Sequence, residues 1–195
     1  YWYMRKYEKG KDYPVYLRKY KSLDSDEELL VDVNELAKGY SYFQLRGISI
    51  SPDNKKMAYA VDTLSRRIYT IKIKNLQTGE MYNEQIKNTT GGSTWANDNK
   101  TLFYSSKNKV TLLSEKIFRH SLNTSYEEDV LVYKETDNEF YTGVYRSKSG
   151  KFIIIWNSST LVSDYHILNT DNPNGNFISF TPVSYTHLRA HETHE

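Results

Sequence analysis

The sequence predicts an all-β protein, an incomplete β-propeller of about four blades, each a four-stranded antiparallel sheet. A pattern of strand, polar turn and strand begins at Ile48, recurs at Ser93 and returns in weaker form at Val144. The copies follow one another after roughly 45 to 50 residues, the length of a four-stranded blade. Almost no segment has the periodicity of a long amphipathic helix. Because one blade cannot bury both of its faces, the repeat indicates several blades stacked around an axis.

The first elements precede the repeat. Tyr13–Tyr20, with Pro14 at its start, is a short predicted strand. Glu27–Val33 leads into a stretch where we expect Asn34 to cap a brief turn of helix. Gly39 is predicted to end that turn, because glycine readily adopts the left-handed conformation that closes a helix.

Alternation of apolar and polar residues defines the strands that follow. In M-A-Y-A-V, Met57, Tyr59 and Val61 share a face opposite two alanines, whose small size lets another sheet approach. Arg67–Lys74 places its apolar residues at every second position, which predicts a half-buried antiparallel strand. The turn N-L-Q-T-G-E comes next, with Gly79 at the expected positive-φ position. Further strands are predicted at Thr101–Ser105, Glu115–Leu122, Val130–Lys134, Phe140–Arg146, Phe152–Trp156 and Ser163–Leu168.

Composition limits the classes of function. The chain has 195 residues, 38% hydrophobic and 26% charged, as in globular proteins, and its net charge of +2 indicates neither a nucleic-acid nor a membrane partner. It contains no apolar run long enough for a membrane-spanning helix and no signal-peptide core. Without an initiator Met, the chain is expected to be part of something longer. The absence of cysteine excludes disulfides and thiolate metal sites and is compatible with the cytoplasmic location that we expect.

Eighteen tyrosines raise the aromatic share to 14%. They could form a stacking surface for sugars or single-stranded nucleic acid. They are, however, spread over the predicted strands, where tyrosine is a good strand former with a hydroxyl that reaches water at a sheet edge. We therefore favour a structural interpretation.

The triplet Gly91-Gly92-Ser93 resembles the start of a hydrolase nucleophile elbow. That elbow needs small residues on both sides of the serine and a helix after it. Here Thr94 and Trp95 follow, without a helical pattern. We interpret the triplet as the loop that enters the next blade.

The last residues break the blade pattern. His187, His191 and His194, with Glu192 and Glu195 nearby, have a spacing that could bind zinc on a helix. The apolar-poor string is more typical of a translated junction joined to a truncated reading frame. We expect a partial propeller over residues 1–182 and a non-native tail over 183–195.

The remaining charged groups indicate no chemistry. Arg66-Arg67 could be a cleavage or phosphate site. Charged residues at the start of a strand, however, more often protect a sheet edge from mispairing. The acidic groups Asp24–Glu28 and Glu127–Asp129 have the composition of solvated turns and lack the spacing of a calcium loop. No glycine-rich phosphate loop is present. The sequence therefore predicts no catalytic, cofactor-binding or metal-binding residue, and no cofactor.

Several longer strings resemble the N-terminal propeller of the prolyl oligopeptidase family of serine peptidases, and within it the oligopeptidase B group. The combination of S-R-R-I-Y-T-I and W-A-N-D-N-K is specific, whereas S-P-D-N-K alone occurs in many propellers. The resemblance extends from about residue 1 to residue 182. The strings that carry it are Tyr7–Tyr16, Val31–Gly39, Ser51–Lys55, Val61–Ile71, Asn75–Glu80 and Trp95–Tyr104.

The resemblance implies a seven-bladed propeller that caps an α/β-hydrolase domain and admits only slender peptides, which the enzyme cleaves after Lys or Arg. The catalytic Ser, Asp and His of the family lie beyond the propeller, so none has a counterpart here. The peptide substrate would bind through that absent hydrolase domain, and this chain alone would be inactive. Two alternatives stay open: a non-catalytic propeller that binds protein partners, and another family hydrolase, prolyl-specific or dipeptidyl.

Half a propeller also leaves the faces of its end blades uncovered. We expect these faces to cause self-association through apolar strand residues. The residues at risk of exposure are Tyr69, Ile71, Phe152, Ile154 and Trp156.

Overall fold

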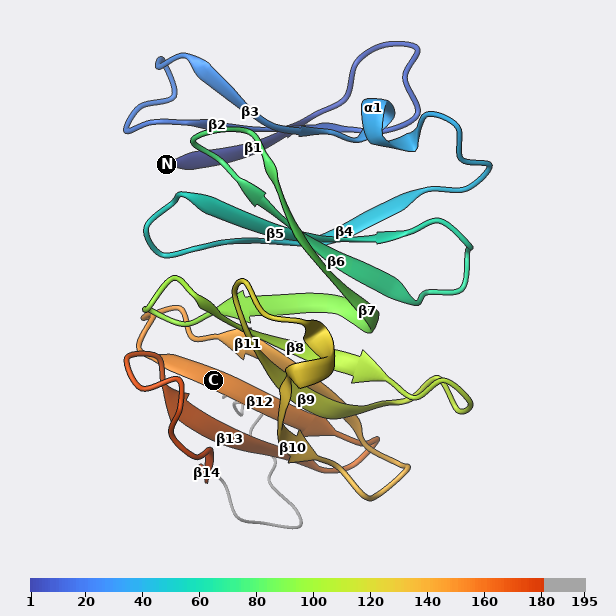
Figure 1. Ribbon diagram of the computed structural model, residues 1–195, viewed down its shortest axis with the longest axis vertical. Helices are drawn as coiled ribbons and strands as arrows, with labels where there is room; N and C mark the ends of the chain where they lie inside the picture. Colours follow the sequence, from blue (N-terminus) through green and yellow to red (C-terminus); the bar gives the residue numbers. More distant parts are fainter. Residues whose placement is uncertain (181–195) are drawn as a thin grey trace, which may run out of the picture. The chain divides into compact units, whose positions relative to one another are not determined.

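The computed structural model describes residues 1–180, and its regular secondary structure is almost entirely antiparallel β-strand (Figure 1). The predicted all-β class is confirmed. The chain divides into two compact units. The first comprises Tyr1–Leu45 and Asp62–Arg66, and the second comprises Arg46–Val61 and the residues from Arg67 onward. Within residues 1–180, no helix is long and apolar enough to cross a membrane.

The first unit holds a three-stranded sheet, β1 (Trp2–Lys6), β2 (Val15–Lys19) and β3 (Glu27–Asp32), in that order. The strand β1 was not predicted. Arg18 is the buried cation of this sheet: its Nε and Nη2 atoms donate to the Glu28 carboxylate at 2.7 and 2.5 Å. This bidentate geometry gives the buried guanidinium a charged partner, although the Glu28 side chain itself is 41% exposed.

A single turn of helix, α1 (Val33–Ala37), follows β3. The prediction that Asn34 caps it was wrong, because the cap is Asp32, whose carboxylate accepts the Asn34 backbone N–H at 2.8 Å. The Asn34 side chain instead donates to the carbonyl of Tyr13 and accepts its N–H, at 2.8 and 3.0 Å. Gly39 has a φ of +84° just beyond the helix, as predicted.

The second unit contains a seven-stranded sheet and a four-stranded sheet. The seven-stranded sheet has the order β10-β9-β8-β7-β6-β5-β4, and the smaller one has the order β11-β12-β13-β14. A short 3-10 helix, η1 (Tyr126–Glu128), precedes β10. The strands are β4 (Gln44–Ile50), β5 (Lys56–Asp62), β6 (Tyr69–Asn75), β7 (Met81–Trp95), β8 (Thr101–Lys107), β9 (Ser114–Ser121), β10 (Val130–Lys134), β11 (Tyr141–Arg146), β12 (Phe152–Ser158), β13 (Ser163–Asn169) and β14 (Ile178–Ser179).

The long strand β7 belongs to two blades. Its first half pairs with β6, from Met81 to Thr89, and its second half pairs with β8, up to Trp95 opposite Leu102. The seven-stranded sheet is therefore two four-stranded blades that share one strand. With β11–β14 and the three-stranded sheet of the first unit, about four blades are present, as predicted, and no sheet closes on itself.

This continuity corrects the interpretation of Gly91-Gly92-Ser93 as a loop, because all three residues lie inside β7. Gly91 has a φ of +88°, and a Cβ built on Gly47 would lie 1.7 Å from the Gly91 carbonyl oxygen. The glycines thus let the shared strand turn from one blade into the next while β4 passes against it.

The repeated turn has one geometry in all three blades. The first residue of each turn donates its N–H to the residue five positions later at 2.9 Å: Ser51 to Lys56, Ala96 to Thr101, and Ser147 to Phe152. The residue three positions after the start has a positive φ in every copy, at Asn54, Asn99 and Gly150. Asparagine and glycine are the residues that tolerate this conformation, which explains the recurring pattern.

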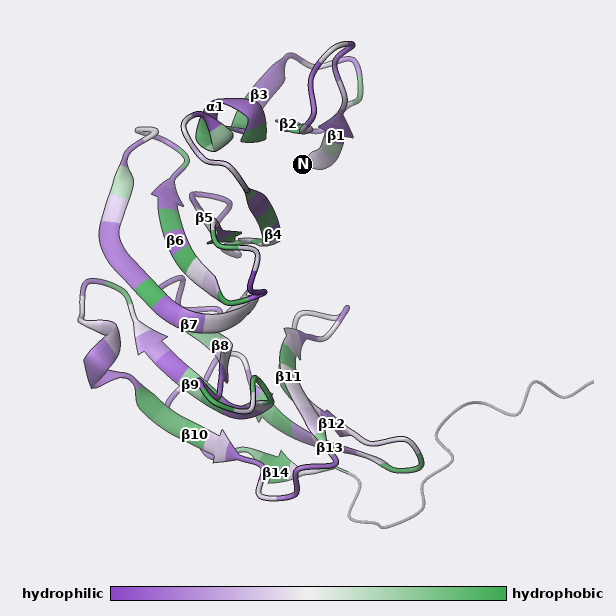
Figure 2. Cartoon of the chain, turned by 90° about the vertical axis from the view of Figure 1, so that its right-hand side faces the viewer, coloured by the Kyte–Doolittle hydropathy of each residue, from purple (hydrophilic) through white to green (hydrophobic). Residues whose placement is uncertain are grey.

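Side chains between the blades form two apolar clusters. Apolar and polar residues alternate along β6, as its colouring in Figure 2 shows. The alternation is confirmed, since Ile71 and Ile73 are fully buried. The Trp95 indole N–H donates to the Ser49 carbonyl at 3.1 Å and so joins two neighbouring blades. One cluster contains Ala58, Ala60, Tyr69, Ile71, Ile73, Ile86, Trp95, Leu102 and Tyr104. The other contains Ala96, Phe103, Ile117, Val144, Ile153, Ile155 and Leu168.

The β11–β14 sheet keeps an apolar face that is only partly covered. Phe152 is 38% exposed, and Ile154 and Trp156 beside it on β12 are half-buried, as expected for an end blade. The same expectation was wrong for Tyr69 and Ile71, which are 1% and 0% exposed. Both lie on the apolar face of β6, which packs in the first of these clusters.

Candidate functional site

Ser93 has no catalytic setting. It pairs with Tyr104 inside the sheet, and its hydroxyl is buried without a hydrogen-bond partner. The two histidines of residues 1–180 each contact a carboxylate instead: His120 contacts Asp129, and His166 contacts Asp164. A serine nucleophile needs a base within hydrogen-bond reach, so Ser93 has no means of activation.

A buried polar cluster lies in the third blade. Asp129 accepts a hydrogen bond from the Tyr104 hydroxyl at 2.8 Å, and its other oxygen lies 2.7 Å from His120 Nδ1. Burial, reinforced by the Asp129 charge, raises the pKa of Tyr104. Asp129 was predicted to lie in a solvated turn, yet its side chain is 1% exposed. Because the cluster is closed to substrate, its role is to tie the start of β10 to β8 and β9.

A second buried network surrounds Asn157 in the fourth blade. Its carbonyl oxygen accepts from the Thr142 hydroxyl at 2.8 Å, and its amide donates to Tyr133 and Asp164 at 2.6 Å each. Burial, followed by the nearby Glu135, raises the pKa of Tyr133. Each donor of Asn157 has an acceptor, which is what makes burial of an amide tolerable. This network, too, is structural.

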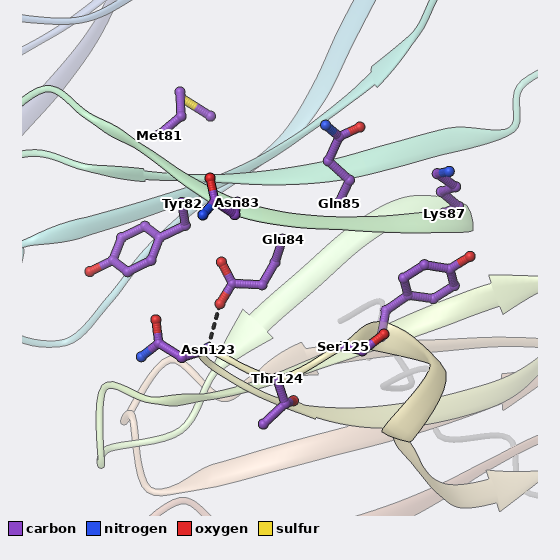
Figure 3. A pocket seen from close by; sticks show the side chains of 10 residues that line it. Met81, Tyr82, Asn83, Glu84, Gln85, Lys87, Asn123, Thr124 and Ser125 are labelled. Atoms are coloured by element: carbon purple, nitrogen blue, oxygen red, sulfur yellow. Dashed lines mark hydrogen bonds between the residues drawn. The ribbon is translucent and has the colours of Figure 1, made fainter.

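A groove in the second unit follows the first half of β7 (Figure 3). It has a volume of about 700 Å³ and lies between Met81–Lys87 and the segment Asn123–Tyr126. The Asn123 N–H donates to the Glu84 carboxylate across it. Its lining is polar and contains neither histidine nor a serine paired with a base. The groove offers hydrogen-bonding groups for binding and no nucleophile for catalysis.

The other charged motifs lie apart from this groove. Arg66 and Arg67 are exposed in the loop between β5 and β6. The edge-protecting interpretation was wrong, because β6 begins at Tyr69 and is paired on both sides. Residues 1–180 contain no group of three His, Asp or Glu residues that could hold a metal ion.

The acidic stretch Asp24–Glu28 is only partly a solvated turn. Asp24 and Asp26 are exposed between strands, whereas Glu27 and Glu28 lie on β3, where they pair with Lys6 and Arg18. The tail residues His187, His191, His194, Glu192 and Glu195 lie outside the described residues. The expectation of a non-native tail without a zinc site therefore stays a prediction.

The tyrosines divide between core and surface. Tyr59, Tyr69 and Tyr104 are buried, in line with the structural interpretation. In the first unit, Tyr1 and Tyr20 are exposed, with ring centroids 5.1 Å apart. The Arg18 guanidinium lies 4.1 Å from the centroid of the Tyr1 ring. The exposed Tyr1 ring therefore already has a cation–π partner within the first unit.

Comparison with known proteins places these blades in a family. Residues 1–194 match the model of the prolyl oligopeptidase N-terminal β-propeller domain. "Dipeptidyl aminopeptidase BI" of Pseudoxanthomonas mexicana is 38% identical over 187 residues, which are 88% of this chain and 26% of that protein. "Protease 2" of Moraxella lacunata is 31% identical over 180 residues, 89% of this chain and 26% of that protein.

A solved structure has the same arrangement of strands. Oligopeptidase B from Leishmania major superimposes with a TM-score of 0.84 at 25% identity, over 94% of this chain and 26% of that one. The chain thus spans about a quarter of the length of the relatives it matches. From the repeated blades and this family match together, the chain belongs to the prolyl oligopeptidase family, in its N-terminal β-propeller domain.

Proposed function

We propose that this chain is the propeller part of a serine oligopeptidase that cleaves short peptides after Lys or Arg, and that the propeller restricts access to the active site. The observation that carries the proposal is the family match over residues 1–194, together with relatives named as peptidases. The catalytic serine, aspartate and histidine would lie in the remaining part of the longer protein.

The blades of the second unit are suited to act as a wall. Their turns are cross-linked: the Asp53 N–H donates to Asn99 at 2.8 Å, and the Asn97 N–H donates to Thr170 at 3.0 Å. These hydrogen bonds hold neighbouring blades together at their turns. Without them, the blades could separate at this end. A rigid wall that offers no nucleophile can exclude folded proteins while taking no part in bond cleavage.

A second specificity has its own support. The relative with 38% identity is named a dipeptidyl aminopeptidase, which is a protein that releases dipeptides from a free amino terminus. Under this alternative, the longer protein would need the substrate's free amino group, whereas an endopeptidase would accept a blocked one.

Reporter peptides test the two activities in the longer protein. An amino-blocked peptide with a reporter amide after arginine should be hydrolysed, and its lysine counterpart too, while the glutamate counterpart should stay intact. Cleavage confined to dipeptide amides with a free amino terminus would favour the dipeptidyl alternative. No hydrolysis of any of these peptides would contradict the proposal and favour a non-catalytic interaction module.

A further inference from the structure

Arg119 is a half-buried cation without a carboxylate partner in the described part of the chain. It lies on β9, and its Nη1 atom donates to the Pro173 carbonyl at 3.0 Å. Within residues 1–180 the guanidinium forms no ion pair, and its remaining N–H donors have no hydrogen-bond partner. A guanidinium presents its donors in a fixed fork that matches a carboxylate. Arg119 can therefore hold an anion that these residues do not supply.

This arginine lines a groove between the third and fourth blades. The groove has a volume of about 390 Å³ and lies between β10 and the segment before β14, which are close together in Figure 2. Val130, the cross-strand partner of Arg119, forms one apolar wall. Phe177, whose ring meets Phe103 edge-on at 5.8 Å, forms another. A cation beside apolar walls predicts a small ligand with a negative charge and an apolar part.

Two amide side chains add the means to bind a peptide backbone. Asn174 and Asn176 line the groove, and neither side chain has a hydrogen-bond partner within residues 1–180. An amide can donate and accept at once, as a peptide unit requires. The segment is held in place by Arg119 and by the Gly175 N–H, which donates to the Asn172 carbonyl at 3.0 Å. A pre-ordered segment loses little entropy when a ligand binds.

The free edge of β10 limits the length of such a peptide. β10 is the last strand of the seven-stranded sheet and pairs only with β9 among the described strands. The register with β9 shifts between Leu131 and Tyr133, which marks a β-bulge. A bulge interrupts the regular edge, so the addition of a long strand is disfavoured. Val130 and Leu131 leave a regular edge for only the last residues of a peptide.

We propose that this groove, formed by Arg119, Val130, Asn174, Asn176 and Phe177, binds the carboxyl-terminal end of a short peptide. The terminal carboxylate pairs with the Arg119 guanidinium, and an apolar last side chain lies against Val130 and Phe177. The two asparagines bond to the peptide backbone. A carboxyl terminus satisfies the cation and also ends the peptide where the regular edge ends. The inference goes beyond the proposed function, because binding here requires no catalytic residue.

Binding of a fluorescent peptide to the longer protein tests the proposal. The probe is Gly-Gly-Leu with fluorescein on its amino terminus and a free carboxylate. It contains neither Lys nor Arg, so it is not a substrate of the proposed activity. The matched control is the same peptide with a terminal carboxamide. We expect fluorescence anisotropy to give a Kd on the order of 100 µM for the carboxylate, and binding of the carboxamide to be weaker by about tenfold.

Variants of the groove locate the binding. Arg119→Gln removes the charge but keeps an N–H donor for the Pro173 carbonyl. It should weaken binding of the carboxylate by about tenfold and leave that of the carboxamide unchanged. Val130→Glu puts a carboxylate across from Arg119 and should compete with the probe, whether or not Arg119→Gln folds. Arg66→Gln is the matched control, because Arg66 is exposed and does not line the groove.

Equal affinity for the two peptides would overturn the proposal, and so would unchanged affinity in folded Arg119→Gln or Val130→Glu. Acetate is tested as a competitor beside the unlabelled peptide. If both compete at the same concentration, the groove recognises an anion only and the peptide assignment fails. Absence of binding to the longer protein would also refute the site, since the groove would then be closed to a free peptide.

Discussion

Three glycines stand at the same position in successive blades, four residues before the repeated turn, and the structure gives them different tolerances. Gly47 has a φ of +66°, and an added Cβ would lie 1.7 Å from the Gly91 carbonyl oxygen. Gly143 has no such φ, but its Cβ would lie 2.3 Å from the indole nitrogen of Trp156. Around Gly92 the nearest atom lies 3.9 Å away, on the Thr90 side chain. Single alanine substitutions at the three positions should therefore change the stability of the fold by three different amounts.

The magnitudes follow from what each Cβ meets. Gly47→Ala combines an unfavourable φ with a clash against backbone, which cannot swing aside, so we expect a loss of about 2 to 4 kcal/mol. Gly143→Ala meets a side chain that is only half-buried and can move, so a loss of about 1 to 2 kcal/mol is expected. Gly92→Ala should change stability by less than about 0.5 kcal/mol, and a small gain is reasonable because glycine weakens a strand.

Urea denaturation followed by tryptophan fluorescence measures the series, with Trp95 buried at 1% exposure as a reporter. With a slope of about 2 kcal/mol per molar urea, Gly47→Ala should lower the midpoint by roughly 1 to 2 M. Gly92→Ala is the matched control, since it adds the same methyl group to the same blade position. Equal midpoints for Gly47→Ala and Gly92→Ala would refute the claim that β4 and β7 meet backbone to backbone.

Four further predictions concern the chain as it stands. This chain alone should not hydrolyse an arginyl-amide reporter, since residues 1–180 hold no activated nucleophile; co-purifying turnover that Ser93→Ala abolishes would count against this. Removing residues 183–195 should leave the melting temperature unchanged, and a zinc-dependent rise in the intact chain would show instead that the tail binds metal. The partly covered face of Phe152 and Trp156 should cause self-association, visible as scattering that rises with concentration; a monomer at all concentrations would contradict it. Burial disfavours ionisation of Asp98, but hydrogen bonds from the Thr101 hydroxyl and nearby N–H groups outweigh it and lower the pKa of Asp98. Its stabilising contribution should be present above the ordinary aspartate pKa near 4 and disappear as the pH falls below it, so Asp98→Asn should flatten the acid limb of the stability profile.

Local features were predictable from the sequence because they depend on neighbours along the chain. The half-buried strand at Tyr69–Asn75 follows from alternation. The turn N-L-Q-T-G-E predicts a positive φ at Gly79, which has a φ of +78°. The end of α1 at Gly39 has the same origin. The cap of that helix was assigned to Asn34 rather than Asp32, since both residue types cap helices and the choice depends on a contact with Tyr13, twenty-one residues away.

The buried polar groups could not be found in this way. Asp129 lies in an acidic string whose composition indicates solvent exposure, yet two partners from other strands, Tyr104 and His120, enclose it.

The sequence by itself determined the repeated blade, its turn and the family. Strand alternation and turn dihedrals depend on residues that are neighbours along the chain. Only the tertiary structure decided that β7 serves two blades, that Gly47 lies against backbone whereas Gly92 faces open space, and that Tyr69 is buried while Phe152 is 38% exposed. These properties depend on which atoms from distant segments meet. Two residues with the same local pattern can face a backbone carbonyl in one blade and open space in the next.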